Sequence, residues 1–256
     1  MRNHISFSEL KIWDECAFKH KLVYVDEVKK FLGNEYTAFG TAIHHVCEKI
    51  VVDEKADLLH LFNTKFLEEL KLLTEKKVEI KKDLIGKMRE QGKHILSFIL
   101  PALKKTFVNF EVVSVEEQLM EPIEDLSFKG FIDLVIKTSD DKYHIIDWKT
   151  CSWGWDSRRK TDRITTYQLT LYKQFFAQKH NIEPKNIETH FALIKRTAKS
   201  NNVEIFSVAS GQKKTENAIN LLNKAIYNIK NSKHIKNRLS CTRGYGCEFY
   251  KTQYCR

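Results

Sequence analysis

Proline and glycine are scarce in this sequence, with three and nine copies among 256 residues. So few chain-breaking residues leave little room for a disordered linker, and we expect one domain with elaborations. No apolar run approaches the roughly 18 residues that cross a bilayer, and the N-terminus lacks a signal-peptide core. We therefore expect a soluble, cytoplasmic protein with no membrane partner. The phosphate-binding pattern GxxxxGK[ST] is also absent, which argues against a fused nucleotide-driven motor.

Basic residues outnumber acidic ones, 43 to 33, and the formal net charge is +10. This balance favours a polyanionic partner, with nucleic acid ahead of a membrane surface. The alternative is a basic surface that binds no polyanion. With 42% hydrophobic residues, the chain can bury a sizeable core. Its six cysteines, in an intracellular protein, are expected to be thiols or metal ligands and not disulfides.

The spacing of apolar residues predicts a chain of mixed helices and strands. A helix is expected to begin after Ser6, because Glu9 completes a capping box with it. Pro101 is expected to kink or end the helix that contains it. Further helices are predicted over 37–52, 57–73, 82–107, 162–179 and 213–235, and strands over 110–119, 128–137, 143–150, 187–195 and 203–208.

The most informative stretch is a predicted hairpin over residues 128–150. Each of its strands carries one acidic residue among apolar neighbours, Asp133 in the first and Asp147 in the second. A buried carboxylate without a partner is costly, so these two need a cation or each other. Side chains alternate along a strand, so Asp147 and Lys149 share a face. Together the three residues could hold a divalent cation and activate a water beside it. The alternative is a structural salt bridge.

Two predicted helices add polar groups. In 37–52, His44 and Glu48 are four residues apart and share a face. Gly40 lies one turn before His44, where the missing side chain lets another backbone approach. A single histidine on such a helix is usually structural. His44 together with Glu48 and Gly40 is a more specific indication of a functional site. In 162–179, Gln168 and Tyr172 share a face and offer hydrogen-bonding groups.

The loop over residues 151–160 contains two tryptophans, Trp153 and Trp155, followed by Arg158, Arg159 and Lys160. Aromatic rings for base stacking and cations for phosphates suit single-stranded nucleic acid. The alternative is a surface loop whose tryptophans pack on the core.

Four motifs occur in sequence order, and together they are more specific than any one of them. They are Gly40-x-x-x-His44-x-x-x-Glu48, Gly130-Phe131-Ile132-Asp133, Asp147-Trp148-Lys149-Thr150 and Gln168-x-x-x-Tyr172. This series resembles the motifs of the PD-(D/E)XK nuclease superfamily, in its RecB-like exonuclease branch. That branch includes the RecB and AddB nuclease domains and the CRISPR-associated RecB-like nucleases. The resemblance extends over the whole chain.

The resemblance implies an α/β fold with a restriction-endonuclease-like core, in which helices flank a mixed sheet. It implies a single nuclease domain over 1–256. Within this domain we expect an N-terminal helix with Cys16 (1–36), a helical region (37–109), the catalytic core (110–210), and a C-terminal helix with a cysteine-bearing tail (211–256).

The resemblance also implies a role for each motif residue. Lys149 would orient and help deprotonate the attacking water, while Gln168 and Tyr172 would position the DNA backbone. The implied cofactor is Mg²⁺ or Mn²⁺, hard cations that prefer oxygen ligands and keep several waters. The metal ligands would be His44, Asp133, Asp147 and the main-chain carbonyl of Trp148.

The cysteines carry a second resemblance. Several members of the branch hold an iron–sulfur cluster with one N-terminal cysteine and three near the C-terminus. Four thiolates suit a [4Fe–4S] cluster, which the resemblance favours, or a zinc ion. Four reduced thiols without a cofactor are the other alternative. The residues with this arrangement are Cys16, Cys241, Cys247 and Cys255.

The implied function is a metal-dependent deoxyribonuclease that hydrolyses phosphodiester bonds. By family analogy it would be an exonuclease on DNA ends or single strands, in recombination, repair or processing. It would act alone or with partners such as a helicase or recombination factors. The alternatives are a structure-specific endonuclease of the same fold and a DNA-binding or assembly module that has lost catalysis. A zinc-stabilised RNA-binding protein would leave the hairpin acids without a role.

Overall fold

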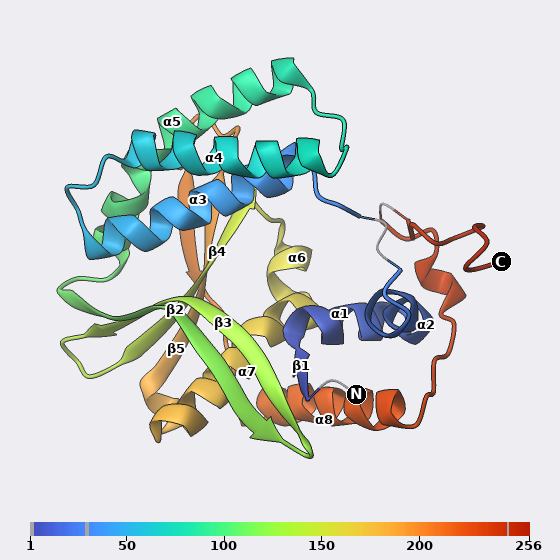
Figure 1. Ribbon diagram of the computed structural model, residues 1–256. Helices are drawn as coiled ribbons and strands as arrows, with labels where there is room; N and C mark the ends of the chain where they lie inside the picture. Colours follow the sequence, from blue (N-terminus) through green and yellow to red (C-terminus); the bar gives the residue numbers. More distant parts are fainter. Residues whose placement is uncertain (1–2, 29–30, 245) are drawn as a thin grey trace. The chain divides into compact units, whose positions relative to one another are not determined.

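The structure is a computed structural model that describes residues 3–28, 31–244 and 246–256. The chain forms two compact units, each assembled from segments that are distant in sequence (Figure 1). Unit 1 comprises Met1–Phe31, Leu119–Gly130 and Gly211–Arg256, and unit 2 comprises Leu32–Gln118 and Phe131–Ser210. No helix in the described ranges is long and apolar enough to cross a membrane.

The strands form a mixed sheet in the order β1-β3-β4-β5-β6, and β2 also pairs with β3. The β3–β4 and β5–β6 pairs are antiparallel, whereas β1–β3 and β4–β5 are parallel. This mixed sheet, with helices packed on it, confirms the predicted fold class. The strands are β1 (His4–Ser6), β2 (Phe110–Ile123), β3 (Leu126–Thr138), β4 (Tyr143–Cys151), β5 (Ile187–Lys195) and β6 (Val203–Ser207).

In unit 2, helices cover both faces of the sheet (Figure 1). On one face lie α3 (Glu35–Val52), α4 (Leu58–Glu75) and α5 (Lys82–Thr106), which share a core with Ile146 and Trp148 of β4. On the other face, α7 (Arg163–His180) packs against β4 and β5. Because side chains alternate along β4, Asp147 and Lys149 point away from the core that α3 shares with the sheet.

Side-chain caps set the starts of several helices. Ser6 accepts a hydrogen bond from the Glu9 main chain at 3.2 Å, which confirms the predicted start of α1 (Phe7–Glu15). The predicted capping box is only half formed, because Glu9 Oε1 lies 2.8 Å from His20 Nε2. Asn34 and Thr37 form a reciprocal capping box, so α3 begins slightly before the predicted position 37. The apolar stripe of α3 recurs at helical spacing and is buried, and it comprises Phe39, Ile43, Val46 and Ile50.

Three local predictions were wrong or incomplete. Helix α5 continues through Pro101 to Thr106, so the proline does not end the helix, and Ile99 and Leu103 on its two sides are both fully buried. Helix α8 (Gln212–Lys230) ends five residues early, where the chain turns through Ser232 with a φ of 52°. The loop after β4 contains a short helix, α6 (Ser157–Thr161), and η2 (Pro184–Asn186) precedes β5.

Unit 1 combines the two ends of the chain. Helix α1 is followed by α2 (Ala17–His20) and by the π-helical turn η1 (Lys21–Val25), and it packs against α8. Strand β1 pairs with β3 through Ile5 and Phe128, both fully buried. The tail begins with the 3₁₀ turn η3 (Arg238–Ser240).

Candidate active site

The β3–β4 hairpin opens at Asp133. Main-chain pairing between the two strands ends at Leu134 and Ile146. Beyond that point, Asp133 Oδ2 accepts a hydrogen bond from the Trp148 main-chain nitrogen at 2.7 Å. The N–H and C=O of one strand residue point toward the same neighbouring strand, so the Trp148 carbonyl is directed to the side of Asp133. The opening therefore gathers a carboxylate and a carbonyl oxygen.

Asp147 contributes a second, more deeply buried carboxylate. It is 1% exposed, and its Oδ2 lies 2.5 Å from Lys149 Nζ. Burial raises the pKa of Asp147, the Lys149 charge opposes this only in part, and the charge of Asp133 adds to the increase. Lys149 Nζ is thus an ion-pair partner of Asp147 Oδ2. The carboxylates of Asp133 and Asp147 are nevertheless oxygen donors of the kind that a divalent metal takes.

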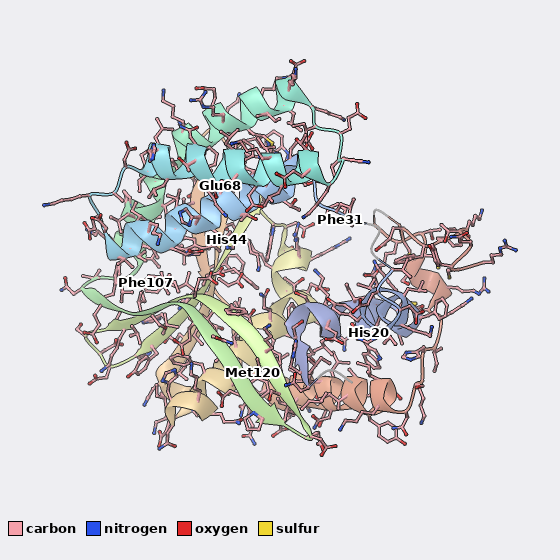
Figure 2. All side chains as sticks on the ribbon, viewed as in Figure 1. His20, Phe31, His44, Glu68, Phe107 and Met120 are labelled. Carbon is pink, nitrogen blue, oxygen red and sulfur yellow. The ribbon has the colours of Figure 1, made fainter. Side chains whose placement is uncertain are left out.

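His44 reaches the same place from α3, and Figure 2 shows it on the side of the helix that faces the strands. Its Nδ1 lies 3.6 Å from Asp133 Oδ2. Burial lowers the pKa of His44, but the close contact with the Asp133 carboxylate and the charge of Asp147 outweigh burial and raise it overall. Gly40 allows this approach, because a Cβ there would lie 3.2 Å from Thr150 Oγ1.

Gln168 and Tyr172 extend from α7. Gln168 Nε2 donates to Tyr172 Oη at 3.3 Å, and Tyr172 is 6% exposed. Burial, with the negative charges of Asp147 and Asp133, raises the pKa of Tyr172. The phenol therefore stays protonated and can donate a hydrogen bond beside the two aspartates.

A further acidic residue, Glu116 of β2, was missed by the sequence reasoning. Burial and the charges of Asp133 and Glu48 raise its pKa to about 7. It lines a cavity of about 430 Å³ with His44 and Glu48. Glu116 has a φ of 51°, which interrupts the alternation of β2. No sequence signal marked it, because it stands beside Glu117 in an ordinary polar strand pattern.

The two tryptophans of the loop after β4 were interpreted either as base-stacking groups or as core-packing groups, and their environments differ. Trp155 is 8% exposed and packs against Phe191 and Phe206, and the Arg159 guanidinium lies 4.5 Å from its ring centre. Trp155 therefore follows the core-packing alternative. Trp153 is 77% exposed and can offer a ring face to a ligand.

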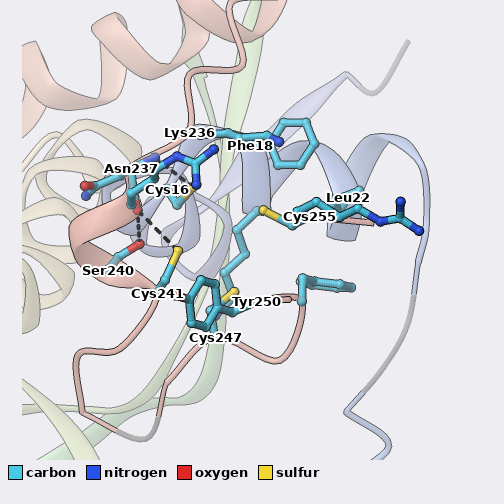
Figure 3. A pocket seen from close by; sticks show the side chains of 14 residues that line it. Cys16, Phe18, Leu22, Lys236, Asn237, Ser240, Cys241, Cys247, Tyr250 and Cys255 are labelled. Atoms are coloured by element: carbon cyan, nitrogen blue, oxygen red, sulfur yellow. Dashed lines mark hydrogen bonds between the residues drawn. The ribbon is translucent and has the colours of Figure 1, made fainter. Parts of the chain in front are cut away.

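In unit 1, four cysteines from distant parts of the chain line one cavity (Figure 3). Cys16 lies between α1 and α2, and the other three are in the tail. All four are free thiols. The Asn237 main-chain nitrogen donates to Cys16 Sγ at 3.3 Å. Four sulfur donors, with Lys19, Lys236 and Arg238 lining the same cavity, have the chemistry for a thiolate-ligated and negatively charged group. No three of these described sulfur atoms lie within 4.8 Å of one another, so a group that they share must be larger than a single ion or must draw them together. These cysteines are Cys16, Cys241, Cys247 and Cys255.

Comparisons with known proteins concern the family and the fold of the chain. A model of the PD-(D/E)XK nuclease superfamily matches residues 4–255. Among solved structures, a protein from Eubacterium rectale described as a candidate exonuclease is similar, with a TM-score of 0.57 and 12% identity over 90% of this chain and 82% of that one. The protein SSO0001 gives a TM-score of 0.40 and 13% identity over 89% and 77%. A search of curated protein sequences finds no significant match.

Proposed function

Because the chain belongs to the PD-(D/E)XK nuclease superfamily, we propose that it is a divalent-metal-dependent deoxyribonuclease. The observation that carries this proposal is the set of Asp133, Asp147 and Lys149 where β3 and β4 diverge. The two carboxylates, His44 and the Trp148 carbonyl would hold Mg²⁺ or Mn²⁺. Such a metal, when bound, supplies Lewis-acid stabilisation of phosphate charge and lowers the pKa of a bound water.

The chain's own residues have distinct parts in this mechanism. Lys149 carries a positive charge 2.5 Å from Asp147, where it would orient the attacking water and stabilise charge that develops on the phosphate. Tyr172, kept protonated, and Gln168 would donate hydrogen bonds to the DNA backbone. Burial of Asp147 strengthens each of these electrostatic interactions, because little water is present to screen them.

We infer the finer activity to be that of an exonuclease on DNA ends or single strands, in recombination, repair or processing. The exposed Trp153, followed by exposed Arg158 and Arg159, supports a single-stranded substrate through base stacking and phosphate contacts. A structure-specific endonuclease remains the alternative, since one fold hosts both activities.

The test uses end-labelled single- and double-stranded DNA, and closed circles, with Mg²⁺, Mn²⁺ or EDTA. We expect metal-dependent degradation of linear DNA, intact circles, and at least a hundredfold loss in Asp147→Asn. Asp141→Asn is the matched control, because Asp141 is an exposed aspartate in the turn of the same hairpin. Cleavage of closed circles would favour the endonuclease. Full activity of a folded Asp147→Asn protein would refute the catalytic assignment.

We also propose that the four cysteines of unit 1 hold a [4Fe–4S] cluster, with zinc as the alternative. Joining Cys16 to a tail at 241–255 closes most of the chain into a loop, which costs several kcal/mol of entropy by the logarithmic rule. Structural zinc binds with roughly 10–16 kcal/mol in small domains, so a metal centre of comparable strength can offset that cost. The Asn237 N–H bond to Cys16 Sγ is also a contact that stabilises a thiolate.

Anaerobic purification tests this cofactor. We expect brown protein with broad absorbance near roughly 400 nm, and loss of colour in Cys241→Ser but not in Cys151→Ser. Cys151 is the matched control, because it is a half-buried free thiol of unit 2. Zinc without iron in elemental analysis would support the alternative, and a protein containing neither metal would exclude both.

A further inference from the structure

Two histidines and a glutamate converge where β4 and β5 begin. His144 Nδ1 lies 3.1 Å from His190 Nε2. Glu188 Oε2 lies 3.8 Å from His144 Nδ1 and 4.0 Å from His190 Nε2. The parallel pairing of the strands produces this grouping, since it places His144 beside Glu188 and Ile146 beside His190. The two histidines are 7% and 6% exposed.

This cluster is separate from the candidate active site. His144 and Asp147 are three residues apart on β4, so their side chains leave opposite faces of the sheet. Both histidine rings pack against Phe107, at 4.8 and 5.0 Å between ring centres. Phe107 follows the end of α5 and is labelled in Figure 2. The cluster thus has an apolar wall, on the sheet face opposite that of the Asp147 and Lys149 side chains.

Neighbouring contacts leave one atom of His144 and one atom of Glu188 directed inward. Thr138 Oγ1 lies 2.9 Å from His144 Nε2, which leaves Nδ1 to face the group. Lys142 Nζ binds Glu188 Oε1 at 2.7 Å, which leaves Oε2 to face the histidines. Outer contacts of this kind orient metal-binding histidines and carboxylates in known sites.

We propose that His144, Glu188 and His190 form a zinc site with a structural role. Tetrahedral zinc with bonds of 2.0–2.2 Å places its ligand atoms about 3.4 Å apart. The separations here are 3.1, 3.8 and 4.0 Å, so small side-chain movements bring all three atoms to that distance. Two imidazoles and one carboxylate suit zinc better than magnesium, and a water would complete the coordination.

The two histidines of the cluster are in the neutral state that zinc binding needs. Burial lowers the pKa of His144, and burial with the nearby His144 charge lowers that of His190 to about 4. Near neutral pH both rings therefore keep a lone pair. The Glu188 side chain is 40% exposed and leaves a route for an ion. A bound ion would join β4 to β5 and so stabilise the strand that carries Asp147 and Lys149.

A metal-free explanation also fits the distances. In it, one neutral ring donates to the other, and Glu188 pairs only with Lys142. The two accounts differ in what the full chain binds, so the test measures binding and not nuclease activity. Its outcome is therefore independent of the proposed function.

The experiment adds Zn²⁺ to EDTA-treated, dialysed full-length protein and records thermal unfolding and zinc content. We compare wild type with Glu188→Gln and His190→Gln. Glu183→Gln is the matched control, because Glu183 forms an exposed pair with Lys185 outside the cluster. Co²⁺ spectra separate this site from the cysteines, since only thiolate ligands give intense sulfur-to-cobalt charge-transfer bands.

We expect wild type and Glu183→Gln to bind one more zinc per chain than the two site variants, and to melt several degrees higher with zinc. Glu188→Gln should weaken zinc binding at least about tenfold. The cobalt bands from sulfur should be the same in all four proteins. Equal zinc content and equal zinc-induced melting shifts in all four would overturn the proposal. Melting without metal checks the folding of each variant, and Glu188→Gln alters only a partly exposed group.

Discussion

Asp147 is 1% exposed, and burial raises the pKa of its carboxyl group in the metal-free protein. The carboxyl group therefore stays neutral to a higher pH in the folded chain than in the unfolded chain. The stability that the neutral carboxyl contributes is fully present below the unfolded pKa of about 4, and it is lost as pH rises through the raised folded pKa. A divalent cation needs the ionised form. At this residue, metal binding favours the ionised form, whereas burial in the metal-free protein favours the neutral form.

A prediction follows for Asp147→Asn in EDTA. The variant has no charge to bury, so we expect it to melt above wild type, with a difference that grows from about pH 4 to neutral pH. One pKa unit corresponds to about 1.4 kcal/mol, so the gain should be on the order of 1–3 kcal/mol. Thermal unfolding across pH measures it, with Asp141→Asn as the exposed control.

Added Mn²⁺ should then stabilise wild type more than Asp147→Asn, because only wild type offers the full set of ligands. A difference in melting temperature that stays constant with pH would show that the Asp147 carboxyl titrates normally in the folded protein.

At the scale of elements, the position of α3 against β4 depends on Gly40. A Cβ at this position would lie 3.2 Å from Thr150 Oγ1, so α3 or Thr150 would have to shift by a few tenths of an ångström. His44 lies one helical turn further and would move relative to Asp133. Small displacements of this kind cost more in catalysis than in stability.

We therefore expect Gly40→Ala to lower kcat/KM about tenfold with little change in melting temperature. Alanine is about 1 kcal/mol better than glycine in a helix, which offsets the local strain. Gly86→Ala on α5 is the control, because no atom of the described residues beyond its own helix backbone and chain neighbours lies within 4 Å of the added Cβ. Combining Gly40→Ala with Thr150→Ala should restore activity. A double variant no better than Gly40→Ala alone would exclude the steric explanation.

For the whole molecule, a net charge of +10 contrasts with a candidate active site rich in carboxylates. The excess positive charge must lie elsewhere on the surface, and Arg158 and Arg159 are exposed after β4. Neutralising DNA phosphates releases counterions, so affinity falls with salt in proportion to the number of phosphates that the protein neutralises.

We expect DNA affinity, measured in EDTA, to fall steeply between low and physiological salt. Replacing both Arg158 and Arg159 with Gln should reduce the slope of log affinity against log salt by about 0.7–0.9 for each phosphate that the variant no longer neutralises. Lys185→Gln, an exposed lysine before β5, is the control. An unchanged slope in the double variant would place the DNA-binding surface on other elements.

The sequence alone determined those features that depend on local pattern. The motif order predicted the family, and hydrophobic periodicity predicted the longer helices and strands, whereas the short elements β1, α2 and α6 were not predicted. Capping by Ser6 and the buried stripe of α3 could be predicted because both depend on residues within a few positions of one another. Sequence spacing also placed Asp147 and Lys149 on one face of a strand.

Only the tertiary structure decided what depends on residues far apart in the chain. The pKa values of Asp147 and Glu116 arise from burial and from charges on other elements, which no local pattern contains. Packing on Phe191 and Phe206 buries Trp155 while Trp153 stays exposed, although both lie in one loop. The His144–Glu188–His190 cluster exists because β4 and β5 pair in parallel, and strand register is set by the packing of the whole sheet.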